Sequence, residues 1–477
     1  MRQRELGAFM ILFGILLLLA CSYFIFRGLE MESKVSELSK SIDNLTRGIG
    51  GEVGVCVINE RGELVYALNP DMKLIPASNV KLLTCAAALH ILGPSYTYET
   101  KVCYSGTLVN GTLYGDIIVK GAGDPSITYE DIRKLAKNIS SLIRLIEGDI
   151  LVDEGIFDEE YVEESWEIED LQYYYAARVS GLSVEKNVIK IVVSPGRREG
   201  DPARVDLIPK TSYVEVVNYV RTVGGDKSDV NARKVFDENK VILRGEIGVQ
   251  SDPVEFVRTV EEPSLYFGNL LMESLELEGV VVRGTVRKGV LPEGAVEIGL
   301  IRSRPLSELV KEMMKRSDNM MADHLLKTIG AFKYGRGSFE NGVRAVTSFL
   351  DELGVPNNIM MVDGSGLSRL NGVSPKILAL LLQKVKDQPY FDYFINSLPI
   401  AGVDGTLKRR MVGTPAEGRV FAKTGTLSGV SALSGYVKSS KGEVVFSIMV
   451  NSPASREELR KIVDGICLEI VRLFGSQ

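Results

Sequence analysis

The chain has few of the side chains on which many hydrolases depend. Its 477 residues contain two histidines, His90 and His324, and a single tryptophan, Trp166. Each histidine lies within an apolar run typical of a helix, and no Gly-x-Ser-x-Gly elbow pairs a serine with either of them. We therefore interpret both histidines as structural. An enzyme with so little histidine must find its general base elsewhere, as serine enzymes that rely on lysine do.

Cysteine is also scarce, and its spacing argues against two kinds of site. The chain has no Cys-x-x-Cys pair and no spacing typical of metal ligands, so we expect neither a metal nor a cofactor. An odd number of cysteines in a large chain predicts no disulfide framework. Buried thiols are the better interpretation of Cys56 and Cys85. The five cysteines are Cys21, Cys56, Cys85, Cys103 and Cys467.

Positive charge is in the minority. The 56 lysines and arginines face 62 acidic residues, which gives a net charge of −6. After the N-terminus the densest basic run is Lys408-Arg409-Arg410, which is too short for the basic face of a nucleic-acid-binding protein, so we expect no nucleic-acid partner. A content of 45% apolar and 25% charged residues is typical of a globular protein. The length predicts two or three domains.

Three short motifs carry the chemistry of the chain. They follow one another as Ser78-Asn79-Val80-Lys81, Ser317-Asp318-Asn319 and Lys423-Thr424-Gly425. On a helix, residues three apart lie on one face, so Lys81 could take the proton of Ser78. Pro76 and an apolar helical pattern over residues 80–92 predict that helix, whose positive N-terminal end would suit an oxyanion.

Each motif also has a purely structural interpretation. Ser78 would cap a helix and Lys81 would be a surface lysine. The second motif lies between helical runs at residues 306–315 and 320–329, where turn and capping residues are common. The third precedes strand-like runs at residues 433–437 and 444–450, so we expect it on or beside a sheet edge. The occurrence of all three in this order favours the catalytic interpretation.

With these motifs the chain resembles the low-molecular-mass penicillin-binding proteins of class C, the D-alanyl-D-alanine carboxypeptidase/endopeptidase family. The second motif starts 239 residues after the first, and the third starts 106 residues after the second. So long a first gap requires an inserted domain, whereas class A beta-lactamases place their second motif much sooner. Further similar segments are residues 121–126, 363–369 and 423–430, so the resemblance runs from about residue 51 to near the C-terminus.

The resemblance implies hydrolysis of cell-wall stem peptides through an acyl-enzyme, with beta-lactams as covalent inhibitors. The activity would be that of a D-Ala-D-Ala carboxypeptidase, and an endopeptidase activity stays open. The implied roles are nucleophile for Ser78, base for Lys81, proton relay for Ser317, a substrate-backbone contact for Asn319, carboxylate binding for Lys423 and Thr424, substrate binding for Gly425, and an oxyanion hole from the N–H groups of Ser78 and Thr426.

Asp153 is a further candidate for substrate binding. It ends the segment Ile150-Leu151-Val152-Asp153, which with Phe157 resembles the family segment whose aspartate approaches the cleft. The resemblance implies that Asp153 receives an ammonium group of the substrate. Residues 153–170 hold ten acidic residues and no basic one, and such a run is usually a solvated face.

Three alternatives to this function remain open. A beta-lactamase uses the same motifs, although no Glu-x-x-x-Asn segment is recognisable at a comparable place. A related esterase or D-amino-acid peptidase is harder to separate, because the motifs fix the reaction rather than the substrate. The third alternative is a catalytically idle penicillin-binding receptor or scaffold, which the intact Ser78, Lys81, Asn319 and Lys423 disfavour.

The N-terminal segment predicts a membrane anchor. Residues 6–26 form an uncharged run long enough to cross a bilayer, and Arg2 and Arg4 precede it. We therefore expect residues 1–27 to be a single-pass anchor that places the catalytic part outside the cytoplasm. A cleaved signal peptide or a lipoprotein signal at Cys21 is the alternative, which the apolar residues 23–26 disfavour.

Residues 28–50 show apolar positions spaced alternately by four and three. The spacing predicts a helical stalk through which two copies would pair, and the alternative is an amphipathic helix lying on its own domain. The apolar positions are Met31, Val35, Leu38, Ile42, Leu45 and Ile49.

The expected fold is α/β (α+β). The resemblance implies a serine beta-lactamase/transpeptidase-like domain of residues 51–105 and 296–477, with an antiparallel sheet flanked by helices. Strand-like runs near both ends predict that N- and C-terminal strands share that sheet, and a capping box at residues 455–458 starts a final helix. Residues 106–295 are richer in short strands and turns, which predicts a β-rich insertion. The pattern does not show its internal division; the resemblance to a family with large inserted domains implies two domains, one nested in the other.

Overall fold

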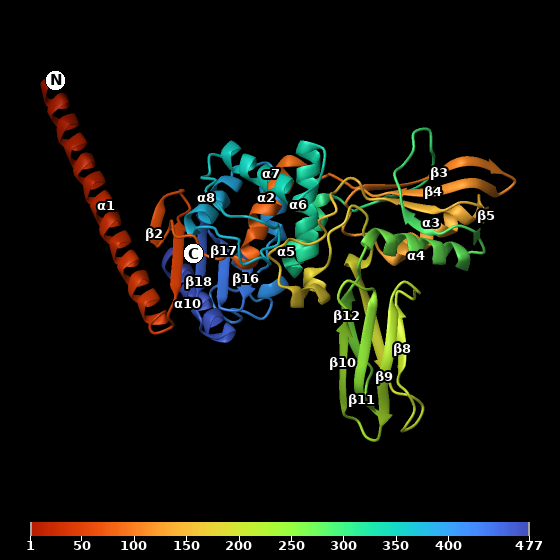
Figure 1. Ribbon diagram of the computed structural model, residues 1–477. Coiled ribbons are helices and arrows are strands. Elements are labelled where there is room, and N and C mark those ends of the chain that lie inside the picture. The colour runs from red at the N-terminus through yellow and green to blue at the C-terminus, as the bar shows by residue number, and fades with distance from the viewer. Residues whose placement is uncertain (1, 476–477) are drawn as a thin grey trace. The chain divides into compact units, whose positions relative to one another are not determined.

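The computed structural model describes residues 2–475, and among the first 28 residues it describes the side chains of Phe13, Ile15, Leu16, Leu17 and Ser22 only. The chain forms two compact units. Figure 1 labels helices and strands described below. The first comprises Met1–Leu74, Ser374–Gln383 and Ile400–Gln477, and the second comprises Ile75–Val373 and Lys384–Pro399. This division cuts the predicted catalytic domain of residues 51–105 and 296–477 and leaves residues 106–295 within the second unit. The predicted domain boundaries stay a prediction.

The first unit is built on one five-stranded sheet in the order β16-β17-β18-β1-β2. Its strands are β1 (Glu52–Ile58), β2 (Leu64–Leu68), β16 (Val420–Leu427), β17 (Val430–Ser439) and β18 (Gly442–Asn451). β1 pairs antiparallel with β18, and Glu52 lies opposite Asn451. The prediction that strands from both ends of the chain share one antiparallel sheet is confirmed.

The helices of the first unit cover this sheet. α10 (Arg456–Phe474) packs against β17 and β18, and Ser455 caps it by accepting a hydrogen bond from the Glu458 N–H at 3.3 Å. The predicted final helix is confirmed. α8 (Pro375–Val385) and the short turn η5 (Gly405–Leu407) complete the regular structure of the region.

The N-terminal helix α1 (Arg2–Leu45) lies along α10 through its second half. Leu38 and Ile42 are fully buried in the core of the first unit, and Met31, Val35 and Leu45 pack against the same core. This packing corrects the stalk predicted for residues 28–50 and matches the alternative, an amphipathic helix on its own domain. An apolar spacing of three and four suits packing against a second copy of the helix and packing against the protein's own domain equally well. The periodicity therefore did not identify which of the two the helix packs against.

The predicted anchor lies mostly outside the described side chains. Residues 2–27 are helical as part of α1, and the described Phe13, Ile15, Leu16 and Leu17 are exposed. Within the residues whose side chains the structure describes, no helix is both long enough and apolar enough to cross a membrane.

The second unit contains a cluster of five helices, in which α2 (Val80–Ile91) contacts each of the other four. α2 is buried along most of its length because its sequence is almost wholly apolar. Its neighbours are α5 (Leu306–Arg316), α6 (Asn319–Tyr334), α7 (Phe339–Glu352) and α9 (Phe391–Ser397).

The rest of the second unit is rich in strands, as predicted. A seven-stranded sheet contains β3 (Glu99–Val109), β4 (Thr112–Lys120), β5 (Leu145–Ile146), β6 (Ile150–Asp153), β13 (Val281–Val282), β14 (Val286–Lys288) and β15 (Val296–Arg302). α3 (Tyr129–Ser140) and α4 (Pro263–Leu277) pack beside it. Because β3 and β15 pair, this sheet extends a few residues beyond both limits of the predicted insertion, 106 and 295.

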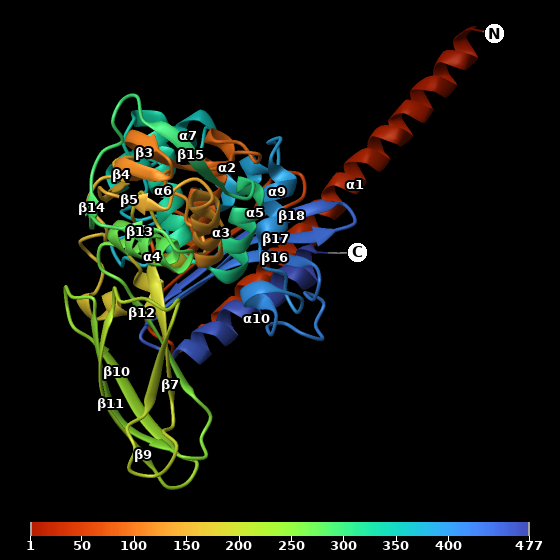
Figure 2. The same ribbon diagram turned by 90° about the vertical axis from the view of Figure 1, so that its right-hand side faces the viewer.

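Two three-stranded sheets lie between β6 and β13 in the sequence. One contains β7 (Val188–Ser194), β8 (Arg204–Ile208) and β12 (Val254–Thr259), and the other contains β9 (Glu215–Val223), β10 (Ser228–Lys234) and β11 (Lys240–Gly248). Figure 2 shows the long strands β10 and β11 side by side, in agreement with their antiparallel pairing. The segment that forms these sheets thus interrupts the segment that forms the seven-stranded sheet.

Candidate active site

Ser78 lies in the turn that leads into a buried helix. The turn η1 (Ala77–Asn79) directly precedes α2, and Ser78 is half-buried between two buried neighbours. The helix predicted from the apolar pattern is therefore confirmed. Since the first N–H groups of a helix have no partner within it, Ser78 stands at the positive end of α2.

Lys81 connects the first two motifs. Its buried Nζ lies 3.0 Å from Ser78 Oγ, 2.7 Å from Asn319 Oδ1 and 2.5 Å from the carbonyl oxygen of Ser365. The surface-lysine interpretation is wrong, because Lys81 has no exposed area. The contacts place the amine where it can exchange a proton with the hydroxyl of Ser78.

The proton affinity of Lys81 is low for a lysine. Burial lowers the pKa of the amine to about 8, against the opposing charges of Asp323, Asp363 and Asp318. At pH 7 roughly a tenth of the molecules would then carry the neutral amine, compared with roughly one in three thousand for an ordinary lysine. The neutral form is the one that can act as a base.

The second motif lies between two helices, as predicted. Ser317 ends α5 in the left-handed region with φ +58°, a conformation that costs a non-glycine residue roughly 1–2 kcal/mol. Asp318 caps α6 by accepting a hydrogen bond from the Met321 N–H at 3.0 Å. Both capping roles are therefore present, and such strain often accompanies functional positions.

Asn319 is fixed at both ends of its amide. Its Oδ1 accepts from Lys81, and its Nδ2 donates to the carbonyl oxygen of Tyr175 at 2.8 Å. The second contact orients the amide, because it decides which end faces the lysine. The structure thus brings Ser78, Lys81 and Asn319 together, with Ser317 two residues away in the same loop.

A turn at residues 363–366 completes the surroundings of Lys81. The carboxylate of Asp363 accepts hydrogen bonds from the N–H groups of Gly366 and Ser368, both at 2.7 Å. The amide of Asn371 and the indole of Trp166 donate to it at 2.9 and 3.0 Å. These four bonds hold the turn whose Ser365 carbonyl contacts Lys81.

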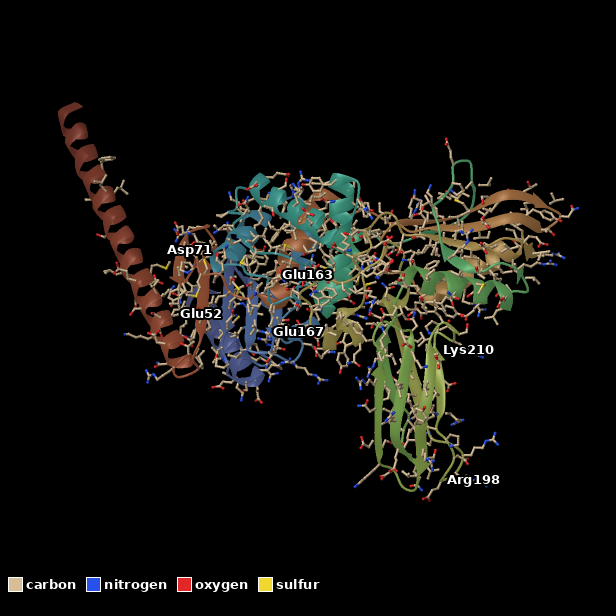
Figure 3. The ribbon with its side chains drawn as sticks, viewed as in Figure 1. Glu52, Asp71, Glu163, Glu167, Arg198 and Lys210 are labelled. Carbon is tan, nitrogen blue, oxygen red and sulfur yellow. The ribbon has the colours of Figure 1, made fainter. Side chains whose placement is uncertain are left out.

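The acidic segment, residues 153–170, is more than a solvated face. Trp166 is buried and donates to Asp363, and the hydroxyls of Ser165 and Ser368 lie 2.5 Å apart. Glu163 accepts from the Ser165 N–H at 2.9 Å, while Glu167 is exposed; Figure 3 labels both side chains. One part of the segment is therefore tied to the turn beside Lys81, while other acidic residues face solvent.

Asp153 lies at the end of β6 and is buried. Its Oδ1 accepts from the Gly155 N–H at 3.1 Å, and its Oδ2 accepts from the Leu291 N–H at 2.9 Å. Both described contacts are with the backbone, so the predicted role in binding a substrate ammonium group stays a prediction.

The third motif lies on β16, an edge strand of the sheet in the first unit, as predicted. Lys423 is buried and its Nζ donates to the carbonyl oxygen of Thr424 at 2.8 Å. The Thr424 hydroxyl lies 2.8 Å from that of Thr406. Ser78 belongs to the other compact unit, so the approach of Lys423 to Ser78 stays a prediction.

The two histidines have structural contacts. His324 is buried and bonds with the Ser183 hydroxyl at 2.9 Å, and burial lowers its pKa to about 4. His90 lies 3.3 Å from Glu352. The structural interpretation agrees with both environments.

Sequence reasoning missed the residues from distant segments that surround Lys81 and Asn319. Ser365 lies in a recognised segment, but its contact through a backbone carbonyl has no signature of its own. Asp323 left a weak signal, since it is an acidic residue in the apolar run of α6, one turn after Asn319. Tyr175 left none, because its carbonyl oxygen makes the contact.

Known proteins resemble the chain over almost its whole length. The model of the D-Ala-D-Ala carboxypeptidase 3 (S13) family matches residues 36–469. The D-alanyl-D-alanine carboxypeptidase of an Actinomadura species is 36% identical over 468 residues, covering 93% of this chain and 86% of that protein.

Solved structures agree with this result. Penicillin-binding protein 4 (dacB) from Haemophilus influenzae has a TM-score of 0.80 at 27% identity, covering 90% of this chain and 99% of that one. The same protein in complex with a novel beta-lactam has a TM-score of 0.74. This likeness confirms the predicted α/β fold.

Proposed function

The chain belongs to the D-Ala-D-Ala carboxypeptidase 3 (S13) family, and we propose that it hydrolyses the terminal D-Ala-D-Ala bond of cell-wall stem peptides through an acyl-enzyme on Ser78. One observation carries the assignment of the residues. The buried amine of Lys81 lies 3.0 Å from Ser78 Oγ and also contacts Asn319. A serine enzyme whose histidines are engaged elsewhere needs such a base.

Acylation starts with a proton transfer from Ser78 to Lys81. The neutral amine takes the proton while Ser78 Oγ attacks the carbonyl carbon of the penultimate D-alanine. The proton then passes to the leaving amine of the terminal D-alanine, and Ser317 serves as the relay. Water hydrolyses the resulting ester, which regenerates Ser78. The same steps applied to a cross-linked peptide would give an endopeptidase.

The remaining roles depend on the approach of β16 to this centre. Lys423 and Thr424 bind the terminal carboxylate of the substrate, Gly425 contributes to substrate binding, and the N–H groups of Ser78 and Thr426 form the oxyanion hole. One such donor is typically worth about 3 kcal/mol of transition-state stabilisation. The order of the three motifs and membership of the family support this arrangement.

Two further assignments are part of the proposal. Asp153 binds an ammonium group of the stem peptide. The substitution Asp153→Ala should therefore weaken the preference for amine-bearing peptides.

An N-terminal anchor holds the enzyme at the outer face of a membrane. The uncharged residues 6–26, which follow Arg2 and Arg4, support this assignment. Washing the membranes with carbonate tests the anchor, because recovery of the full chain in the supernatant would count against it.

The central test compares the natural protein with Ser78→Ala. We expect the natural protein to bind labelled penicillin covalently and to release D-alanine from diacetyl-Lys-D-Ala-D-Ala, and the variant to do neither. Covalent labelling of the variant would contradict the assignment of the nucleophile. Turnover of nitrocefin without release of D-alanine would identify a beta-lactamase, and labelling without any turnover would identify an idle receptor.

A further inference from the structure

Asp323 is a buried acid beside the centre to which the mechanism gives no role. It lies on α6, four residues after Asn319, so the two side chains project from neighbouring positions on one face of that helix. Its carboxyl group has no exposed area. A buried acid is costly unless its environment compensates it, so its presence requires a physical explanation.

The contacts of Asp323 lead to Lys81. Its Oδ1 accepts a hydrogen bond from the Gly364 N–H at 2.7 Å. The carbonyl oxygen of the following residue, Ser365, accepts from Lys81 at 2.5 Å. Thr84, one turn after Lys81 on α2, donates to the Gly364 carbonyl oxygen at 2.8 Å. Gly364, the residue before the carbonyl that faces Lys81, is thus held from α6 through its N–H group and from α2 through its carbonyl oxygen.

The charges around Lys81 come from three segments outside its own helix. The loop before α6 contributes Asp318, α6 contributes Asp323, and the turn after α7 contributes Asp363. Asp318 is paired with Lys186 at 2.7 Å. Asp363 is held by four hydrogen bonds, described above. Asp323 has the largest electrostatic influence of the three on Lys81.

We propose that Asp323 is a positioning residue of this centre, which fixes Gly364 and through it the Ser365 carbonyl that faces Lys81, and whose charge sets the pH at which Lys81 becomes a neutral base. The inference rests on the proposed function. Burial, assisted by the charge of Asp363, raises the pKa of Asp323 well above its usual range. The protonation state of the carboxyl group and that of the amine therefore depend on each other, as those of interacting buried groups do.

The direction of the effect follows from the sign of the charge. An ionised Asp323 favours the ammonium form of Lys81 and so raises the pKa of the amine. Removal of that charge lets the amine lose its proton at lower pH. The acidic limb of the pH–rate profile then moves to lower pH.

Asp323→Asn tests this inference, because the amide oxygen can still accept from the Gly364 N–H while the charge is lost. We expect the acidic limb for acylation by penicillin to move down by roughly one pH unit, the size expected for one nearby buried charge. Thr84→Val is the matched control, because it loosens the same residue, Gly364, without a change of charge. It should slow acylation by roughly fivefold, the value of one hydrogen bond, without moving the limb.

An unmoved limb in Asp323→Asn would overturn the inference, as would an equal movement in Thr84→Val. If Asp323→Asn does not fold, Asp323→Glu gives the test, since it keeps the charge and should keep the limb in place while acylation slows. A limb that moves in Asp323→Glu would overturn the inference. Failure of the natural protein to be acylated would instead contradict the proposed function.

Discussion

At the scale of the single residue, the centre depends on how the amine of Lys81 is surrounded. Three oxygen atoms face it, from Ser78, Asn319 and Ser365. An ammonium group donates to all three, whereas a neutral amine donates to two and has a lone pair left for the proton of Ser78. Asn319 and Ser365 can therefore hold the neutral amine with its lone pair directed at Ser78.

This arrangement predicts the pH dependence of acylation. Burial lowers the pKa of Lys81 to about 8, and only the neutral amine accepts the proton of Ser78. The rate constant for acylation by penicillin should therefore rise with pH through that region and level off above it. Stopped-flow measurements between pH 6 and pH 9.5, about 1.5–2 units on either side of this pKa, would show the rise. A rate that falls over the same interval would exclude Lys81 as the base.

At the scale of the element, the turn at residues 363–366 is pressed against the start of α2. Gly366 has φ +79°, and a Cβ there would lie 1.9 Å from the carbonyl oxygen of Ala77. Ala77 itself has φ +47°, so the backbone beside Ser78 is already in an uncommon conformation. The position of the nucleophile thus depends on the absence of a side chain from a segment almost 300 residues away.

Gly366→Ala should consequently displace Ser78. We expect a loss of stability of about 2–3 kcal/mol and a fall in acylation of at least tenfold, measured by thermal unfolding and by penicillin labelling. Gly335→Ala is the matched control. Gly335 ends α6 with φ +84° and has open space around its Cβ position, so the change should cost about 1 kcal/mol and leave acylation intact. Equal losses of acylation would show that only general stability is involved.

Local elements were predictable because their signals are local. The apolar pattern after Pro76 predicted α2, and the polar interruption at residues 317–319 predicted the loop between α5 and α6. The contacts that complete the centre were not predictable. The Ser365 carbonyl and the Asp323 carboxyl reach their partners across long sequence separations, and neither contact imposes a pattern on nearby residues.

At the scale of the whole molecule, the sequence predicted that strands from both ends share a sheet, because alternation of apolar residues marks strands wherever they lie. It did not predict the partner of the apolar stripe on α1. Leu38 and Ile42 pack on the protein's own core, and a second helix from another copy would have satisfied the same spacing. The spacing of apolar residues thus identifies which face of a helix is buried, but not which element packs against that face.

The last prediction concerns the two compact units together. If β16 approaches Ser78, the ammonium group of Lys423 recognises the free carboxylate of the terminal D-alanine. The natural enzyme should then prefer diacetyl-Lys-D-Ala-D-Ala over its C-terminal amide. Lys423→Met should lower kcat/KM for the free acid by roughly 10- to 100-fold, as expected for a lost charged hydrogen bond, and leave the amide little changed.

Lys438→Met provides the matched control, because Lys438 lies on the adjoining strand β17 with its amine 4.2 Å from the ring of Phe421. It should retain the preference for the free acid. A Lys423→Met variant that also retains this preference would show that β16 does not deliver its lysine to the substrate carboxylate. The roles of Ser78 and Lys81 would stand in that case, because their contacts lie within one unit, and carboxylate recognition would have to come from another part of the chain.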